Sequence, residues 1–387
     1  MIQPCGVQVL HELGVLDAVL AAGAVPLDSL TMVIDDDVHI DATLEESDDL
    51  QSSLCVRRVT LDALLVDAAA AAGADVRTGT RVTGLIREGG RVTGVQTAAG
   101  PIYGQLVVGA DGRHSTVASQ VGAREYHVAP AGKMFAWAYF DGVRNREGRA
   151  WIGRKGPRGF LAGPTDGDLY MAAIGIDMTA QAEFHADRDA NFTAGLRAWP
   201  ELADVLADGH RVGPIRVLTN WYGYFRDAAG PGWVLLGDAG HFKDPTPGQG
   251  IGDAFRQARR LAPAIEDGLG NTNPDVATQR WWQWRDDDAY EMYWFASDMG
   301  APGAATPLMT RFMKDLSRDP ASTMAFFQVL NREIRPSQLF TRSRGLRAAA
   351  HLLVERPGHL IPTLKEIVGQ ARLNVRRARL RRAVLET

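Results

Sequence analysis

Apolar residues recur at helical spacing in the first part of the chain. Residues 7–20 (VQVLHELGVLDAVL) place six aliphatic side chains on one stripe, which predicts an amphipathic helix. A second helix is predicted over 61–72, where leucine and alanine side chains face inward. Thr60 is its plausible N-cap, and Gly73 ends the pattern.

The pattern then changes to short runs in which apolar and polar residues alternate, as is typical of strands. The four runs are 76–80, 81–88, 91–97 and 105–109. A pair of glycines, Gly89-Gly90, predicts a hairpin turn between the second run and the third.

Residues 126 to about 232 are also rich in predicted strands, and their aromatic residues fall in alternating runs such as FAWAYF at 135–140. The apolar strand at 233–236 follows, with a helix predicted from about 250 to 265. From residue 279 onward the pattern is helical, ending in the basic segment VRRARLRRA at 375–383. We expect a solvated amphipathic helix end there, with contact to an acidic surface as the alternative.

Composition narrows the class of protein. A chain of 387 residues is long enough for two domains, and its 45% hydrophobic and 23% charged residues are ordinary for a globular protein. The net charge of −4 does not suggest a nucleic-acid partner. No apolar stretch reaches the roughly 18 residues of a membrane span, and the first residues lack a signal-peptide layout, so we expect a cytoplasmic protein.

The two cysteines, Cys5 and Cys55, are too few for a disulfide framework and lack the spacing of metal ligands. We therefore predict no metal site. Cys55 lies between apolar residues, and we expect a buried, inert thiol.

The stretch GDAGHFKDPTPGQG at 237–250 places an acid directly after a buried strand, and a glycine-rich turn before a helix. A carboxylate at the carboxyl edge of a sheet lies where open α/β folds bind ligands, and it suits the hydroxyl groups of a ribose or ribitol. Glycines let the backbone approach a flat ring closely, and the N–H groups of the helix start favour an anion. Pro245 and Pro247 stiffen the loop. The whole string therefore favours a cofactor site over an ordinary turn.

At this point the chain resembles the FAD-dependent, para-hydroxybenzoate-hydroxylase-like (group A) flavoprotein monooxygenases. The resemblance implies that Asp238 binds the flavin ribitol and that the amides of Gly248 to Gly252 face the N1–C2 carbonyl edge of the flavin. Gly252 stands where many relatives carry Asn, so a side-chain hydrogen bond would be lost while backbone contacts remain. The cofactor-binding residues predicted in this stretch are Gly237, Asp238, Pro245, Gly248, Gln249, Gly250, Ile251 and Gly252.

The segment VVGADGRHSTV at 107–117 matches the Asp-Gly motif of the same family. The resemblance assigns Asp111 and Gly112 to the cofactor site, with Asp111 holding the loop and associated with flavin and pyridine nucleotide. Ser115 matches the family pattern, whereas Ala118 replaces a frequent Arg.

CVRRVTLDALL at 55–65 matches the Arg-x-x-Leu opening of a family helix, with Arg58 three residues before Leu61. A guanidinium suits a pyrophosphate or a ring-edge oxygen, so Arg58 is a predicted cofactor ligand. Arg57 is the competing candidate, and a surface salt bridge is the alternative role for both.

The family opens with a strand–GxGxxG–helix unit, and nothing in this chain fits it. We expect that a βαβ unit of roughly 30 residues is absent from this length, because of a start placed too late or a clipped sequence. The alternative is a natural short product that binds flavin weakly or not at all. An in-frame GxGxxG upstream of Met1 would decide for the first, and stoichiometric flavin on the purified chain would contradict it.

Pattern and resemblance together predict a mixed α/β fold. A Rossmann-like FAD-binding domain carries an inserted, mostly antiparallel substrate sheet and is followed by a helical C-terminus. The predicted parts are 1–125 and 233–290 for FAD binding, 126–232 for the substrate sheet and 291–387 for the helical region.

The resemblance implies an enzyme that uses FAD, with NAD(P)H as co-substrate, and hydroxylates an aromatic or polyketide-like small molecule with O2 through a flavin C4a-hydroperoxide. His241 and Asp244 are candidates for proton transfer, although His241 as a loop hydrogen-bonder fits equally well. Aromatic residues on strands are usually core, but four are predicted to contact substrate. They are Trp137, Tyr139, Trp221 and Tyr222.

Other functions keep the same motifs. A flavin-dependent reductase or dehydrogenase, for instance polyprenyl-reductase-like, would differ in lacking substrate-stimulated O2 uptake with NADPH. A truncated non-catalytic homologue is a further alternative. A flavin-dependent halogenase is disfavoured because the Trp-x-Trp-x-Ile-Pro signature is absent and WWQWRDD at 281–287 does not replace it. The sequence specifies neither the substrate, nor NADH against NADPH, nor the oligomeric state.

Overall fold

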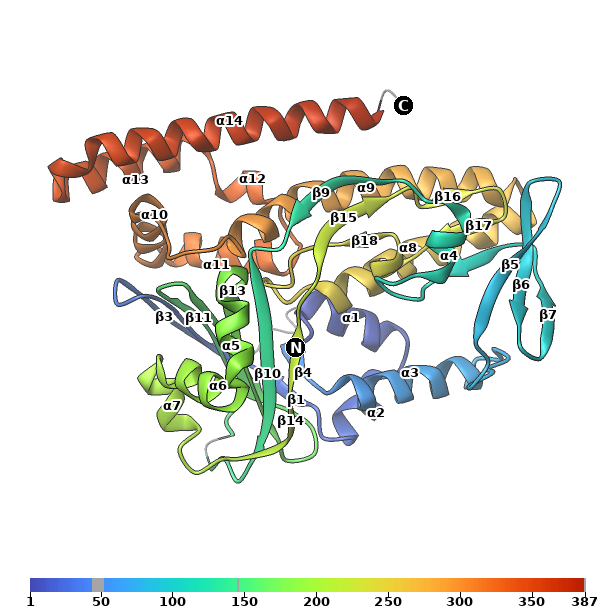
Figure 1. Ribbon diagram of the computed structural model, residues 1–387, viewed down its shortest axis with the longest axis horizontal. Helices are drawn as coiled ribbons and strands as arrows, with labels where there is room; N and C mark the ends of the chain where they lie inside the picture. The colour runs from blue at the N-terminus through green and yellow to red at the C-terminus, as the bar shows by residue number, and fades with distance from the viewer. Residues whose placement is uncertain (44–51, 145, 386–387) are drawn as a thin grey trace.

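The computed structural model describes residues 1–43, 52–144 and 146–385. Its largest sheet has seven strands in the order β14-β10-β13-β12-β11-β2-β3 (Figure 1). All neighbours are antiparallel except β11 and β2, which are parallel. The strands are β14 (His210–Leu218), β10 (Lys133–Asp141), β13 (Tyr170–Asp177), β12 (Arg158–Pro164), β11 (Arg149–Lys155), β2 (Ser29–Ile34) and β3 (Val38–Thr43).

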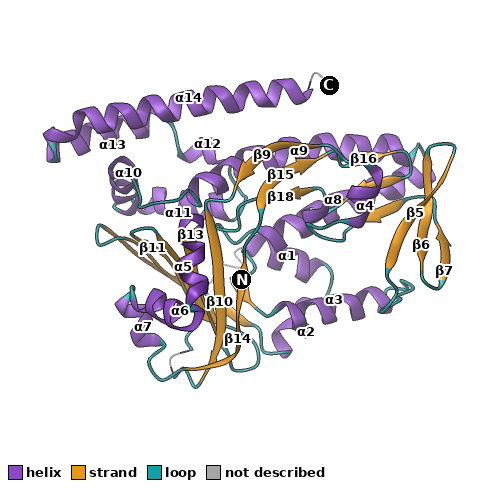
Figure 2. Ribbon diagram, in the orientation of Figure 1, coloured by secondary structure: helices purple, strands orange, loops and turns teal. Residues whose placement is uncertain are grey.

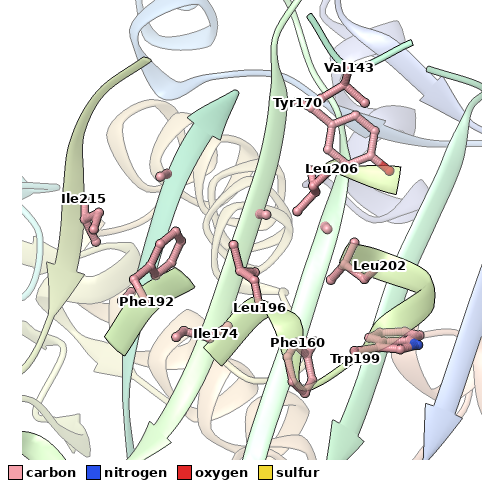
Figure 3. Packing of buried hydrophobic residues seen from close by; sticks show 14 of the residues in the cluster. Val143, Phe160, Tyr170, Ile174, Phe192, Leu196, Trp199, Leu202, Leu206 and Ile215 are labelled. Atoms are coloured by element: carbon pink, nitrogen blue, oxygen red, sulfur yellow. The ribbon is translucent and has the colours of Figure 1, made fainter. Parts of the chain in front are cut away.

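Three short helices pack on one face of this sheet and bury a large apolar cluster (Figure 3). They are α5 (Gln181–Ala186), α6 (Arg188–Arg197) and α7 (Pro200–Val205). Side chains at alternate strand positions, such as Phe160 and Ile174, meet Leu196 and Trp199 in this core. The strand-rich pattern of this region is confirmed, but the three helices were not predicted from the sequence.

Two parallel strands, β8 (Val107–Gly109) and β17 (Trp233–Leu235), form the centre of a second region. The strand β16 (Ala229–Gly230) pairs with β17, and α8 (Gly250–Gly270) and α9 (Pro274–Met299) pack beside them. The helix α4 (Thr116–Val121) follows β8. The predicted apolar strand and the helix after it are confirmed.

A separate antiparallel sheet lies at one end of the molecule, with β5 (Val82–Glu88), β6 (Arg91–Thr97) and β7 (Gly100–Tyr103) (Figure 2). The predicted hairpin is confirmed, and its two glycines have φ angles of 56° and 85°. The strand predicted at 76–80 is wrong, because that segment forms turns.

The helix predicted over 7–20 is two helices, α1 (Pro4–Glu12) and α2 (Leu16–Ala21). Gly14 interrupts the periodic pattern with a φ of 67°, a left-handed conformation that a continuous helix does not accommodate. The helix predicted over 61–72 begins three residues earlier, as α3 (Arg58–Ala71).

Two smaller sheets and the C-terminal helices complete the described chain. The sheets are β1 (Val25–Leu27) with β4 (Ser53–Cys55), and β18 (His241–Phe242) with β15 (Tyr222–Arg226) and β9 (Glu125–Pro130). The helices are α10 (Pro307–Ser317), α11 (Pro320–Leu330), α12 (Pro336–Leu339), α13 (Arg342–Glu355) and α14 (Leu360–Leu385). Among the described helices, none combines the length and apolarity needed to span a membrane.

Candidate functional site

The parallel strands β8 and β17 bring two acidic loops to the same sheet edge. Gly109 lies opposite Leu235 at the end of the paired segment. Asp111 follows β8 by two residues, and Asp238 lies in a short 3₁₀ turn, η2 (Gly237–Ala239), just after β17. Because parallel strands end at the same edge, both carboxylates lie where α/β sheets bind ligands.

Asp238 is half-buried, and burial followed by the nearby Asp253 raises the pKa of its carboxyl to about 6. Two arginines, Arg58 and Arg113, oppose this shift. No side chain or backbone group of the described residues donates a hydrogen bond to the Asp238 carboxylate, while its backbone oxygen accepts one from Tyr224 Oη at 2.6 Å. The carboxylate therefore has acceptor capacity to spare for a ligand.

Asp111 uses its carboxylate within its own loop. Its Oδ1 accepts a hydrogen bond from Ser115 Oγ at 2.5 Å, and its Oδ2 accepts one from the Thr116 amide at 2.7 Å. Gly112 follows with a φ of 74°, and a Cβ there would meet no atom within 4 Å. Asp111 thus fixes the loop, and the backbone at Gly112 stays open.

The glycine-rich turn leads directly into α8, whose first N–H groups have no partner within the helix. Gly248 has a φ of 65°. A Cβ at Gly250 would meet no atom within 4 Å, so the space beside Gly250 is open. The Gln249 side chain is buried and donates to the Leu330 carbonyl at 2.5 Å. The backbone of this turn, rather than the Gln249 side chain, therefore faces the open side. Ile251 packs partly buried against the N-terminal apolar cluster.

A buried ion pair holds the turn from behind. Lys243 Nζ lies 2.5 Å from Asp253 Oδ2 and donates to Gln249 Oε1 at 2.7 Å. Arg332 Nε lies 3.4 Å from the other Asp253 oxygen. Burial lowers the pKa of Lys243 to about 8. The sequence did not predict this pair, because a lysine in a loop is ordinarily exposed and only the structure shows that Lys243 is buried.

The predicted proton-transfer residues lie inside the loop. His241 is buried, with its ring 4.5 Å from that of Phe225, and burial followed by Arg285 lowers its pKa well below the ordinary value. Asp244 is buried as well and accepts hydrogen bonds from the backbone N and Oγ1 of Thr246, at 2.9 and 2.5 Å. Burial raises the pKa of Asp244 to about 6. Pro245 follows in the same loop and accepts the Gly248 amide at 2.8 Å.

The two arginines before α3 have different partners. Arg57 Nε donates to Asp166 at 2.9 Å, and the Arg57 amide donates to the same carboxylate at 2.6 Å. Arg58 is more exposed, forms a surface salt bridge with Asp62 at 2.8 Å and lies within electrostatic reach of Asp238. Arg57 therefore makes a structural contact with Asp166, and Arg58 lies near the loop that carries Asp238.

The four predicted substrate residues divide between two places. Trp137 and Tyr139 lie on the sheet face opposite to the helix-covered one, in a cluster that includes Leu161. Trp221 and Tyr222 line a cavity of 430 Å³ beside the Asp111 loop. Arginine and aromatic side chains dominate that cavity, with Arg113, His114, Glu125, Tyr224, Arg226 and Phe242 in its wall.

These features fit a flavin nucleotide. A half-buried carboxylate with free acceptor capacity matches ribityl hydroxyls, and an open glycine turn at a helix start matches a polar ring edge. Arg58 and Arg113 add positive charge on the same side.

Comparison with known proteins agrees with this fit. A family model described as "FAD binding domain" matches residues 1–274. The chain is 26% identical over 179 residues to a tryptophan 2-halogenase of Chondromyces crocatus, covering 43% of this chain and 34% of that protein. It is 27% identical over 198 residues to a 6-methylpretetramide 4-monooxygenase of Streptomyces rimosus, covering 50% and 47%. The match thus spans between a third and a half of these relatives' own length.

Among solved structures, the flavin-dependent brominase Bmp2 superposes with a TM-score of 0.72 at 17% identity, covering 92% of this chain and 89% of that one. The two proteins share a fold.

Proposed function

This chain belongs to the FAD-binding-domain family of aromatic-hydroxylase-like flavoproteins, and we propose that it is an FAD-dependent monooxygenase that hydroxylates an aromatic or polyketide-like small molecule. The observation that carries the proposal is Asp238. Its carboxylate stands at the end of a parallel strand, half-buried and free to accept hydrogen bonds, beside the open start of α8.

In this proposal the chain binds and orients the flavin through few groups. Asp238 accepts hydrogen bonds from ribityl hydroxyls, and the free amides from Gly250 to Gly252 stabilise negative charge on the ring edge. Arg58 neutralises phosphate charge. When bound, FAD supplies the electron transfer and O2 activation that amino-acid side chains lack.

The sheet face opposite the three helices carries the substrate part of the proposal. Trp137, Tyr139 and Leu161 form an apolar surface there, opposite the helix-covered core, and exclude water from a planar substrate. We assign residues 126–232 to substrate binding, together with β2 and β3, which complete the same sheet. Residues 1–125 and 233–290 are assigned to FAD, and 291–387 to a helical region.

NAD(P)H as co-substrate is supported by the cavity beside the Asp111 loop. Arg113 offers a guanidinium group to a phosphate, whereas the guanidinium of Arg226 is paired with Glu125 at 2.9 Å. Trp221 and Tyr222 offer flat surfaces to a nicotinamide or adenine ring. His241 and Asp244 are assigned to support of the loop, because both side chains are buried behind it.

Halogenation is the second candidate function, favoured by the local similarity to a tryptophan 2-halogenase. The two functions differ in what is transferred to the substrate and in the electron source. A halogenase requires a halide, and it does not require that substrate stimulate NAD(P)H oxidation by this chain.

The test is a steady-state assay of the purified chain with FAD, NAD(P)H, O2 and a panel of phenolic substrates, with and without bromide and with and without a separate flavin reductase. The proposal expects NAD(P)H oxidation and O2 uptake that rise with a substrate, and a hydroxylated product by mass spectrometry. A brominated product that needs a separate flavin reductase would replace hydroxylation by halogenation. NAD(P)H oxidation with a reduced product and no O2 uptake would overturn both.

A further inference from the structure

The C-terminal helix α14 has two opposite faces, and one of them is packed against the molecule along α9 (Figure 1). Arg377 forms a bidentate pair with Asp298, with N···O distances of 2.6 and 2.8 Å. Tyr290 Oη donates to the Arg377 carbonyl at 2.5 Å, and Arg381 pairs with Asp287. These contacts fix which face of α14 points outward.

The outward face carries apolar side chains at alternating intervals of three and four residues, which is the a and d spacing of a coiled-coil heptad. Ile361 is 65% exposed, Leu364 51% and Val375 53%. Such exposure of a regular apolar stripe is unusual for scattered surface residues. The stripe, called the α14 seam below, consists of Ile361, Leu364, Val368, Ala371, Val375 and Ala378.

Every e position beside this stripe is basic. Lys365, Arg372 and Arg379 occupy these positions, all three are exposed, and the salt bridges of the described residues involve none of them. In residues 360–385 the sequence has seven Lys or Arg and one acid, Glu366. Glu366 accepts a hydrogen bond from the Oγ1 of Thr306, the N-cap of α10, and it does not offset the charges of the e positions.

We propose that the α14 seam is a docking surface for an acidic amphipathic helix of another protein. The seam supplies apolar knobs at a and d, and the e-position cations select a partner with Glu or Asp along its own flanks. The heptad spacing sets the contact, and the charge sets the kind of partner.

A second copy of this chain is a poor occupant. Two antiparallel seams would bring e positions against e positions, so that Lys and Arg face Lys and Arg. Two parallel seams would bring e against g, and the g positions are Ile367, Asn374 and Arg381, without an acid.

A membrane surface is also a poor occupant. Residues 360–385 contain no Trp, Tyr or Phe, and the apolar stripe is the narrow a/d seam rather than a wide apolar face.

The test uses the full 387-residue chain and a designed helical peptide of three heptads, with Leu at a and d and Glu at e and g. This peptide repels itself, so it stays free to bind the seam. A matched peptide with Gln in place of Glu is the ligand control. Affinity is measured by fluorescence anisotropy with a labelled peptide at two salt concentrations.

We expect saturable binding of the Glu peptide that weakens with salt. The triple variant Lys365→Glu, Arg372→Glu and Arg379→Glu should weaken it by about tenfold or more and gain affinity for a peptide with Lys in place of Glu. The double variant Leu364→Gln and Val368→Gln should weaken the binding of both the Glu peptide and the Gln peptide. The matched control, Arg81→Glu, Arg188→Glu and Arg197→Glu on remote exposed sites, should leave affinity unchanged.

Equal binding of the Glu and Gln peptides, or unchanged affinity in the triple variant, overturns the proposal. Sedimentation that shows a dimer lost in Val368→Glu assigns the seam to a second copy instead. Seam-dependent binding to phosphatidylserine vesicles assigns it to a membrane. Either result also overturns it.

Discussion

At the residue scale, the loop at 237–250 combines residues of opposite electrostatic character. Asp238 keeps an unused carboxylate on the open side, whereas Lys243 and Asp253 neutralise each other behind the loop at 2.5 Å. The sequence predicted the first, because an acid after a buried strand is a local pattern. It did not predict the second, because Lys243 and Asp253 are brought together only by the packing of the loop on α8, and the neighbouring Arg332 lies far along the chain.

Asp244 makes a pH-dependent contribution to stability. Burial raises its pKa from 3.8 to about 6 in the folded protein, so the folded state holds a proton that the unfolded chain releases at lower pH. The stabilisation from this group is complete below pH 3.8 and is lost as the pH rises through 6. Asp244→Asn cannot ionise and still accepts from Thr246. The unfolding free energy of the variant minus that of the wild type, measured by urea titration, should therefore increase by about 2 kcal/mol between pH 4 and 7. A difference that does not change with pH would contradict this.

At the element scale, the sequence predicted most elements near the site but not their neighbours. The strand 233–236, the helix after it and the Gly89-Gly90 hairpin follow from local patterns. The recruitment of β2 and β3 to the seven-stranded sheet depends on the parallel pairing of β2 with β11, more than a hundred residues apart. Trp137 and Trp221 stand in similar aromatic strand patterns, so the sequence does not distinguish them. The structure places Trp137 in a cluster on one sheet face and Trp221 in the wall of the cavity.

The turn between α9 and α10 packs closely on the loop at 237–250. A Cβ at Gly300 would overlap the Asp244 carboxylate. Gly300→Ala should therefore lower stability by about 1–3 kcal/mol, since the side chain of Asp244 has to move. Gly345 in α13 is the control, because a Cβ there meets nothing within 4 Å, and Gly345→Ala should stabilise by about 0.5–1 kcal/mol. Thermal unfolding of both variants checks the opposite signs, and equal shifts would rule out the close contact.

At the scale of the whole molecule, Asp166 joins the start of α3 to the turn between β12 and β13. Its side chain is 1% exposed and accepts from Arg57 and from Thr60 Oγ1, the latter at 2.6 Å. Asp166→Asn should cost about 2–3 kcal/mol, because it removes a charged, buried acceptor. Asp168→Asn, two residues away and fully exposed, should cost less than about 1 kcal/mol. Urea unfolding that gives equal losses would argue against this junction.

The central claim is that the turn after Asp238 binds the flavin, and a titration of FAD fluorescence with the purified chain tests it most directly. The account predicts saturable quenching by the wild-type chain and by Asp75→Ala, an exposed acidic control. It predicts an affinity lower by about tenfold or more for Asp238→Ala, since two or more hydrogen bonds to a carboxylate are lost. Equal FAD affinity in the wild type and in Asp238→Ala would contradict the claim.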